Sequence, residues 1–193
     1  MESVMQTVEN HINYCDVLVE FKDVTCPPAG DDGIKMSLSD YPNKAAFEEA
    51  AITALTEKHG YTLKGLRYKL INANFNSSSY FNSTDISARL WELFSMDIDD
   101  IDAVYAYYEA FEVEPRLGLL GPQAVLEHLN NESFFLGHHY TKSKMAEEYL
   151  SRLNDNDGIL DLVMPYANLE GVADEIMKEK NVVVMHDHYF IKS

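Results

Sequence analysis

The stretch "SDYPNKAAFEEAAITALTEKHG" (residues 39–60) decides the expected fold of the first part of the chain. Its spacing of apolar residues predicts a helix of about four turns. Gly60 stands where the residue after a helix end commonly takes a left-handed conformation. The expected apolar stripe consists of Ala46, Phe47, Ala50, Ala54 and Leu55.

Strand-like segments flank this helix on both sides. "DVLVEF" (16–21) and "IKMSL" (34–38) precede it, and "LRYKLINANF" (66–75) follows it. The Pro, Gly and Asp residues of "CPPAGDDG" (26–33) indicate a loop between the first two strands. The resulting order is β-β-α-β, an α+β pattern, and the polar residues of "NSSSYFNST" (76–84) suggest its boundary.

The middle of the chain is predicted to be helical. Ser83, Thr84 or Asp85 can cap a helix through "ISARLWELFSM" (86–96), with Trp91 at a domain contact. The acidic stretch "SMDIDDIDAVYAYYEAFEVEP" (95–115) and the stretch "GPQAVLEHLNN" (121–131), which has Pro122 in its first turn, follow as further helices. The residues expected on the apolar side of the first helix are Ile86, Leu90, Leu93 and Phe94.

The last third of the chain again mixes helix and strand. After "ESFFLGHHY" (132–140), two amphipathic helices are expected in "TKSKMAEEYLSRLN" (141–154) and "NLEGVADEIMKEK" (168–180), and "NVVVMHDHYFI" (181–191) ends the chain as a strand. We therefore expect an α+β protein with three small domains: an N-terminal α+β domain (1–82), a central helical acidic domain (83–131) and a C-terminal α+β domain (132–193).

Composition excludes several classes of protein. The 193 residues are 46% hydrophobic and 24% charged, which is typical of a globular chain. The formal net charge of −17 makes binding to DNA or to an anionic membrane unfavourable and favours a partner with a basic surface.

The termini and cysteines indicate a cytoplasmic protein. The first 21 residues lack the basic and apolar regions of a secretory signal, and no apolar run reaches the length of a membrane helix. Cys15 and Cys26 are too few to staple the chain, so buried apolar side chains or surface thiols are favoured over a disulfide or a redox pair.

No calcium-binding loop is indicated. Counted as an EF-hand from Asp97, the ligand position 5 falls on Ile101 and position 12 on Tyr108, so the register fails. "DNDG" (155–158) fails as well, because Ile159 and Leu160 follow it where a ligand and a glycine are needed.

Zinc and catalytic motifs are weakly supported. The candidate zinc ligands are His138, His139, His186 and His188, and the last two are expected on one face of a strand. Without HExxH or CxxC, a histidine-bearing strand is favoured over a metal site. GxSxG, GxxxxGK[ST] and GxGxxG are also missing, so the sequence favours a protein that is not an enzyme and that uses no cofactor.

The acidic stretch predicts a helix with a core-facing stripe and a charged remainder. Asp97 suits the N-cap, and Asp99 and Asp100 suit the positive end of the helix dipole. No Lys, Arg or His occurs between Asp97 and Glu114, although exposed helices usually intersperse them. The expected core-facing residues are Ile98, Ile101, Val104, Tyr105, Tyr108 and Phe111, and the carboxylates outside this arc are Asp99, Asp100, Asp102, Glu109 and Glu114.

Two interpretations of these charges are open. If the whole stretch from Asp97 to Glu114 is one helix, its seven carboxylates lie at roughly one per 3.6 Å of axis. This is close to the one phosphate per about 3.4 Å of a DNA strand. An ordinary solvated acidic face and a surface that mimics DNA both satisfy this spacing.

The C-terminal third resembles the antirestriction protein ArdA family. "FFLGHHYTKSKMAEEYL" (134–150) and "LDLVMPYANLEGVADEI" (160–176) are similar to the family's aromatic strand, acidic helix, proline-containing turn and second helix. "LWELFSMDIDDIDAVYAYYEA" (90–110) and "YPNKAAFEEAAITALTE" (41–57) look like its central and first-domain helices. The N-terminus diverges from the family's Gly-rich opening. The positions that match the second helix motif are Tyr166, Glu170, Glu175 and Ile176.

This resemblance implies an elongated, three-domain, dimeric protein that imitates bent B-form DNA. Such a protein would occupy the DNA-binding groove of a type I restriction-modification methyltransferase and so let incoming mobile DNA escape, without catalysing a reaction. The expected partner-binding acidic surface comprises Asp97, Asp99, Asp100, Asp102, Glu109, Glu112, Glu114, Glu132, Glu147, Glu148, Asp155, Asp157, Asp161, Glu170, Asp174 and Glu175.

Two other functions are compatible with the sequence. An acidic inhibitor or adaptor could bind a different basic protein, such as another nucleic-acid-binding defence complex, and duplex DNA would not displace it from a partner that it binds elsewhere. A metalloenzyme that uses His186 and His188 would contain stoichiometric zinc.

Overall fold

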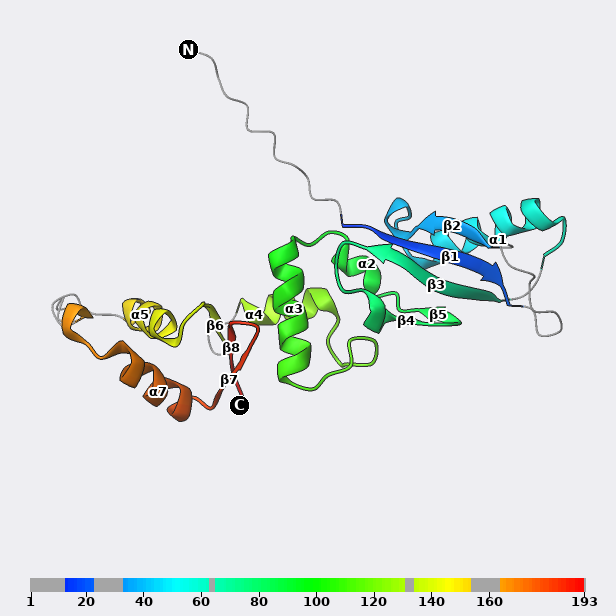
Figure 1. Ribbon diagram of the computed structural model, residues 1–193. Coiled ribbons are helices and arrows are strands. Elements are labelled where there is room, and N and C mark those ends of the chain that lie inside the picture. Colours follow the sequence, from blue (N-terminus) through cyan, green and yellow to red (C-terminus); the bar gives the residue numbers. More distant parts are fainter. Residues whose placement is uncertain (1–12, 23–32, 63–64, 131–133, 154–163, 193) are drawn as a thin grey trace, which may run out of the picture. The chain divides into compact units, whose positions relative to one another are not determined.

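The computed structural model describes residues 13–22, 33–62, 65–130, 134–153 and 164–192 (Figure 1). Contacts between Cα atoms divide the chain into two units, residues 1–101 and 102–193. Helices and small antiparallel sheets occur in both units, which confirms the α+β class. The division into three domains is not confirmed.

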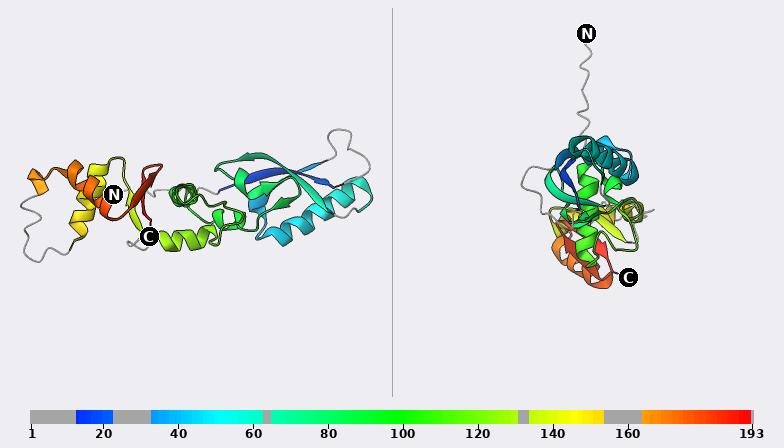
Figure 2. Two further views of the ribbon diagram at one scale, coloured as in Figure 1. Left: turned by 90° about the horizontal axis from the view of Figure 1, so that it is seen from below. Right: turned by 90° about the vertical axis from the view of Figure 1, so that its right-hand side faces the viewer.

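The first unit is built on a three-stranded antiparallel sheet. Its order is β2 (Ile34–Ser37), β1 (Cys15–Phe21) and β3 (Leu66–Ala73), and each strand lies within a stretch that the sequence predicts to be a strand. Every second residue of β1, from Cys15 to Phe21, is buried, which is the two-residue period of a strand with one face in a core. Helix α1 (Lys44–His59) lies along the sheet (Figure 2) and contacts β1 and β2.

Helix α1 ends before Gly60 as the sequence predicts and begins at Lys44, inside the predicted stretch, but its buried row is different. The Asn43 side chain accepts a hydrogen bond from the Ala46 amide, and Gly60 follows the last turn with φ 74°. Alanines 46, 50 and 54, which were expected in the stripe, are only partly buried. The fully buried residues are Phe47, Ala51 and Leu55. Their spacing of four residues places them in one row against the sheet.

The predicted helix over residues 86–96 is wrong in its first half. Asp85–Ile86 form strand β5, which pairs with β4 (Phe81–Asn82), and only Leu90–Leu93 form a helix, α2. The turn between the strands is closed by the Asn82 side chain, which accepts hydrogen bonds from the Thr84 amide and hydroxyl. These local bonds compete with the expected helix cap.

Trp91 packs inside the first unit. Its indole Nε1 donates a hydrogen bond to the Tyr41 carbonyl at 3.1 Å, and its ring lies 6.1 Å from that of Phe47. The ring of Phe47 also lies against those of Tyr41 and Tyr68. These ring contacts connect Trp91 to α1, so Trp91 packs in the core of the first unit.

Buried polar groups at the start of β1 are satisfied. Asn13 is 1% exposed, and its amide donates to the carbonyls of Leu93 and Met96, at 3.0 and 2.6 Å. These bonds connect the start of the first strand to carbonyl groups at the end of α2 and just beyond it, where helical partners are missing or shared. Cys15 is buried as a free thiol, and burial raises its pKa to about 11, whereas Cys26 lies outside the described residues.

The second unit contains a three-stranded antiparallel sheet and four α-helices within its described residues. The sheet order is β6 (Phe135–His138), β8 (His188–Ile191) and β7 (Val182–Met185). Helices α5 (Lys142–Arg152) and α7 (Leu169–Glu179) lie side by side (Figures 1 and 2), and the 3-10 turn η3 (Met164–Tyr166) precedes α7. Their core consists of Leu136, Met145, Ala146, Ala173, Ile176 and Tyr189.

Two further helices carry the acidic middle of the sequence. α3 (Ile98–Ala110) crosses the boundary between the two units, and α4 (Pro122–Leu129) begins with proline at its first position, as expected. None of the helices in the described ranges combines the length and the apolar character that crossing a bilayer requires.

The final stretch is a hairpin, and the prediction of one strand is wrong. β7 and β8 pair in register from Val182↔Ile191 to Met185↔His188. His186 and Asp187 form the two-residue turn, with φ of 48° and 62°. Two successive positive φ values are those of the turn type that matches the twist of antiparallel strands.

Removing the Phe47 side chain should destabilise the first unit. Phe47 is fully buried among the rings of Tyr41, Tyr68 and Trp91. We expect Phe47→Ala to lower the free energy of unfolding by about 3–5 kcal/mol, measured by urea denaturation. Glu57→Ala, at an exposed site on the same helix, should change it by less than about 0.5 kcal/mol. Equal effects of the two substitutions would contradict this core.

Candidate acidic interface

Helix α3 is shorter than the acidic stretch. It ends at Ala110, and Glu112 has φ 54°, a left-handed conformation that directs the chain away from the helix axis. Glu112 and Glu114 therefore lie outside the helix, and the prediction of one continuous helical row of charges is wrong. The phosphate-like spacing applies at most to the four carboxylates within α3: Asp99, Asp100, Asp102 and Glu109.

The buried side of α3 is wider than predicted. Ile101, Val104 and Tyr108 are buried as expected, whereas Ile98 is 40% exposed and Tyr105 is half-buried. Small side chains let the backbone approach its neighbours, and they broaden the buried face. The alanines that contribute are Ala103, Ala106 and Ala110. The carboxylates Asp99, Asp102 and Glu109 remain exposed.

Most carboxylates of the acidic stretch have no counter-charge. In the part of the chain that the structure describes, no Lys, Arg or His forms an ion pair with Asp97, Asp99, Asp100, Asp102, Glu112 or Glu114. Glu109 differs, because its Oε2 lies 2.7 Å from Nε2 of His186 in the β7–β8 turn. Six carboxylates are therefore available to an external cation.

The environment of Asp100 shows that clustered carboxylates without counter-charges disfavour ionisation. Partial burial raises the pKa of the Asp100 carboxyl, and the charges of Asp97 and Asp99 raise it further. Asp16 in β1 shows the usual case, because hydrogen bonds from Lys35 and Ser37 lower the pKa of its carboxyl. Ionisation of Asp100 thus carries a local penalty, which a nearby cation would lower.

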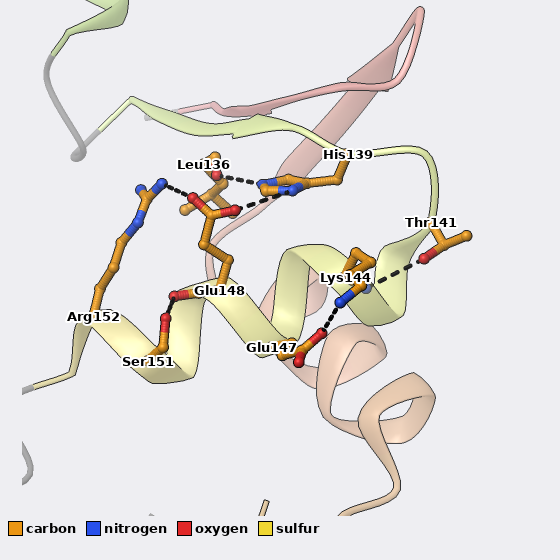
Figure 3. Close-up of polar contacts among 8 residues, drawn as sticks. All are labelled: Leu136, His139, Thr141, Lys144, Glu147, Glu148, Ser151 and Arg152. Atoms are coloured by element: carbon orange, nitrogen blue, oxygen red, sulfur yellow. Dashed lines mark hydrogen bonds and ion pairs between the residues drawn. The ribbon is translucent and has the colours of Figure 1, made fainter. Parts of the chain in front are cut away.

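The acidic residues expected to extend the surface along α5 and α7 are largely neutralised. Glu147 accepts a hydrogen bond from Lys144 at 2.5 Å, Glu148 pairs with Arg152, and Asp174 lies 2.7 Å from Lys142 (Figure 3 shows the first two). These pairs remove net charge from that part of the predicted surface. Glu170 and Glu175 remain exposed on α7. The predicted residues that lie outside the described ranges are Glu132, Asp155, Asp157 and Asp161.

His139 has a structural environment that the sequence does not reveal. It is 7% exposed, with Nε2 at 2.9 Å from the Leu136 carbonyl and Nδ1 at 3.5 Å from Glu148 (Figure 3). Gly137 leaves room for the ring, since a Cβ there would lie 2.5 Å from Nε2 of His139. Glu148 thus connects α5 to His139, the residue that follows β6.

The prediction that His186 and His188 share one strand face is wrong. His186 lies in the hairpin turn and His188 in β8, so they do not share one strand face. The His188 ring stacks on His138 at 4.5 Å, and its Nδ1 donates to the His186 carbonyl. Burial lowers the pKa of His188, chiefly by desolvation. Among the described residues, no group of three or more His, Cys, Asp or Glu side chains is placed to hold a metal ion.

Replacing Asp100 by a neutral isostere should stabilise the protein. The pKa of Asp100 is higher in the folded chain than in the unfolded chain, so the folded chain binds the carboxyl proton more tightly. Proton binding therefore stabilises the folded state at low pH, and this stabilisation is lost as pH rises through the folded-state pKa. We expect Asp100→Asn to raise Tm by about 1–2 °C at pH 7. Asp97 and Asp99 remain to interact with the helix dipole.

The gain should vanish near pH 3, where calorimetry should give equal Tm values because both side chains are then neutral. The same change at Asp16, whose pKa is lowered, should give no gain at pH 7. A Tm of Asp100→Asn that is unchanged or lower at pH 7 would contradict the unfavourable environment.

The sequence matches no protein-family model and no curated protein, and the structure matches no solved structure. The function is therefore inferred from the charge, exposure and contacts of these side chains, together with the motif resemblance.

Proposed function

We propose that this chain is a non-enzymatic acidic DNA mimic that occupies the DNA-binding groove of a type I restriction-modification methyltransferase. In this role it would protect incoming mobile DNA from host defence, acting in the cytoplasm as a homodimer. The observation that carries the proposal is the set of six carboxylates in and around α3 that have no counter-charge among the described residues.

The physical basis is competition for the same cations. A DNA groove in a protein is lined by Lys and Arg that bind phosphates, and carboxylates on an ordered helix offer equivalent acceptors. An array that is already held in place binds without a large ordering cost. Ion pairs with the groove would also relieve the repulsion that raises the pKa of Asp100.

The order of elements in the second unit supports the motif resemblance. A strand (β6), a helix that carries Glu147 and Glu148 (α5), a turn that contains Pro165 (η3), a second helix (α7) and a terminal hairpin occur in this order, as the resemblance to the ArdA family implies. In the first unit, α1 lies against a small sheet. It falls in the stretch 41–57, which looks like the family's first-domain helix.

Reversing three charges of α3 should abolish the inhibitory binding. We expect the triple variant Asp99→Lys, Asp100→Lys and Asp102→Lys to bind a purified type I methyltransferase about 10²-fold more weakly or worse, because it replaces attraction by repulsion in the groove. Titration at several salt concentrations measures this affinity, which should fall steeply with salt in the unmodified chain.

The matched control reverses three exposed acids elsewhere, Asp40, Glu49 and Glu57. Both variants change the net charge from −17 to −11. The control should keep most of the affinity. Lys near the start of α3 also opposes the helix dipole, so the Asn versions of the three α3 substitutions provide a second test in which circular dichroism verifies the fold. Undiminished binding by both α3 variants would count heavily against the proposal.

Competition with duplex DNA separates this function from that of an acidic adaptor. DNA should displace the chain from the methyltransferase if both occupy one groove, and the apparent Kd should rise in proportion to the DNA added. A complex that tolerates saturating DNA would support an adaptor that binds the enzyme elsewhere.

A further inference from the structure

Two leucines after α3 are exposed on a loop whose backbone is held in place. Leu117 is 70% exposed and Leu119 is 100% exposed. They lie in "EVEPRLGLLG" (112–121), which connects α3 to α4 within the second unit. The sequence analysis assigns them no role. Single exposed apolar residues are common on protein surfaces. These two leucines differ because the loop that carries them is held by hydrogen bonds and close packing.

Hydrogen bonds fix this loop at both ends. The Val113 amide donates to the Tyr108 carbonyl at 2.8 Å, and the amides of Leu117 and Gly118 donate to the Glu114 carbonyl at 3.0 and 2.8 Å. The Tyr108 hydroxyl donates to the Leu120 carbonyl at 3.2 Å.

The loop also packs tightly on itself. A Cβ at Gly118 would lie 2.4 Å from Cγ1 of Val113. Because the loop cannot turn its leucines inward without breaking these contacts, the two side chains are presented to solvent in a preorganised position.

The charges beside the leucines select the kind of partner. Glu112 and Glu114 are exposed in the same loop and form no ion pair within the described ranges, and with the half-buried Arg116 beside Leu117 the loop carries two acids and one base. If this loop faced the same loop of a second copy, the glutamates of both copies would repel each other, so a homodimer would have to form through another surface. A protein surface with an apolar pocket rimmed by Lys or Arg complements both the leucines and the glutamates.

We propose that Leu117 and Leu119 are apolar anchors that insert into a pocket beside the basic groove of the partner enzyme. This inference rests on the proposed function and adds a contact that phosphate mimicry does not supply. Carboxylates compete with DNA for Lys and Arg, and their contribution weakens with salt. The leucines contribute through burial of apolar surface, which ordinary salt concentrations do not screen.

The test compares salt dependence in two classes of variant. We expect Leu117→Ala/Leu119→Ala to bind the purified methyltransferase about 10²-fold more weakly, roughly tenfold per leucine, with the same slope of log Kd against log salt as the unmodified chain. Neutralising Asp99, Asp100 and Asp102 to Asn should instead reduce that slope. Leu117→Met/Leu119→Met should restore binding, because methionine keeps the apolar volume.

A matched control removes exposed apolar side chains elsewhere. Ile71→Ala/Val184→Ala alters residues that are 46% and 37% exposed, and it should leave the affinity within about twofold. Thermal unfolding of the leucine variant should match that of the unmodified chain, since fully exposed side chains contribute little to packing.

Three outcomes would overturn the inference. Unchanged affinity of the alanine variant, while the α3 variants lose binding, would remove the leucine anchors and leave the proposed function standing. A loss of self-association by the alanine variant in analytical ultracentrifugation, with methyltransferase binding intact, would assign the leucines to a second copy instead. No binding of the unmodified chain to the methyltransferase would refute the proposed function and this inference together.

Discussion

Helix α3 has to bury one side in the protein while it carries carboxylates that nothing in the described chain neutralises. Burial of Ile101, Val104 and Tyr108 holds the helix in place against the mutual repulsion of its charges. Asp100 shows the conflict most clearly, because it is partly buried beside two other carboxylates and its pKa is raised. Packing of the buried residues has to offset the unfavourable ionisation of this side chain in the folded protein.

The acidic residues of the chain fall into two physical groups. Along α5 and α7, lysine and arginine lie within reach of glutamate and aspartate, so the charges cancel locally and connect neighbouring elements. Around α3 and the loop that follows it, only Glu109 has such a partner among the described residues, His186, and exposed leucines stand beside the unpaired carboxylates of Glu112 and Glu114. Net charge alone does not separate these groups, since one is a set of structural pairs and the other is a surface available to a basic partner.

Sequence periodicity predicts the regular elements well where local signals agree. The strand pattern of β1, Gly60 at the end of α1 and Pro122 at the start of α4 correspond to the structure. Prediction fails where a few side-chain hydrogen bonds redirect the chain. The Asn82 side chain closes a hairpin in place of a helix cap, and the positive φ values of His186 and Asp187 turn one expected strand into two.

The sequence by itself determined the α+β class, the order of most helices and strands, and the excess of negative charge, because these follow from period, composition and short-range caps. Only the tertiary structure decided which charges stay unpaired and which apolar side chains stay exposed. The pairing of Glu109 with His186 joins residues 77 positions apart, and the pairing of Asp174 with Lys142 joins residues 32 apart. The exposure of Leu119 depends on hydrogen bonds that close its loop. Contacts of this range depend on how helices and strands pack, and no local pattern in the sequence encodes them.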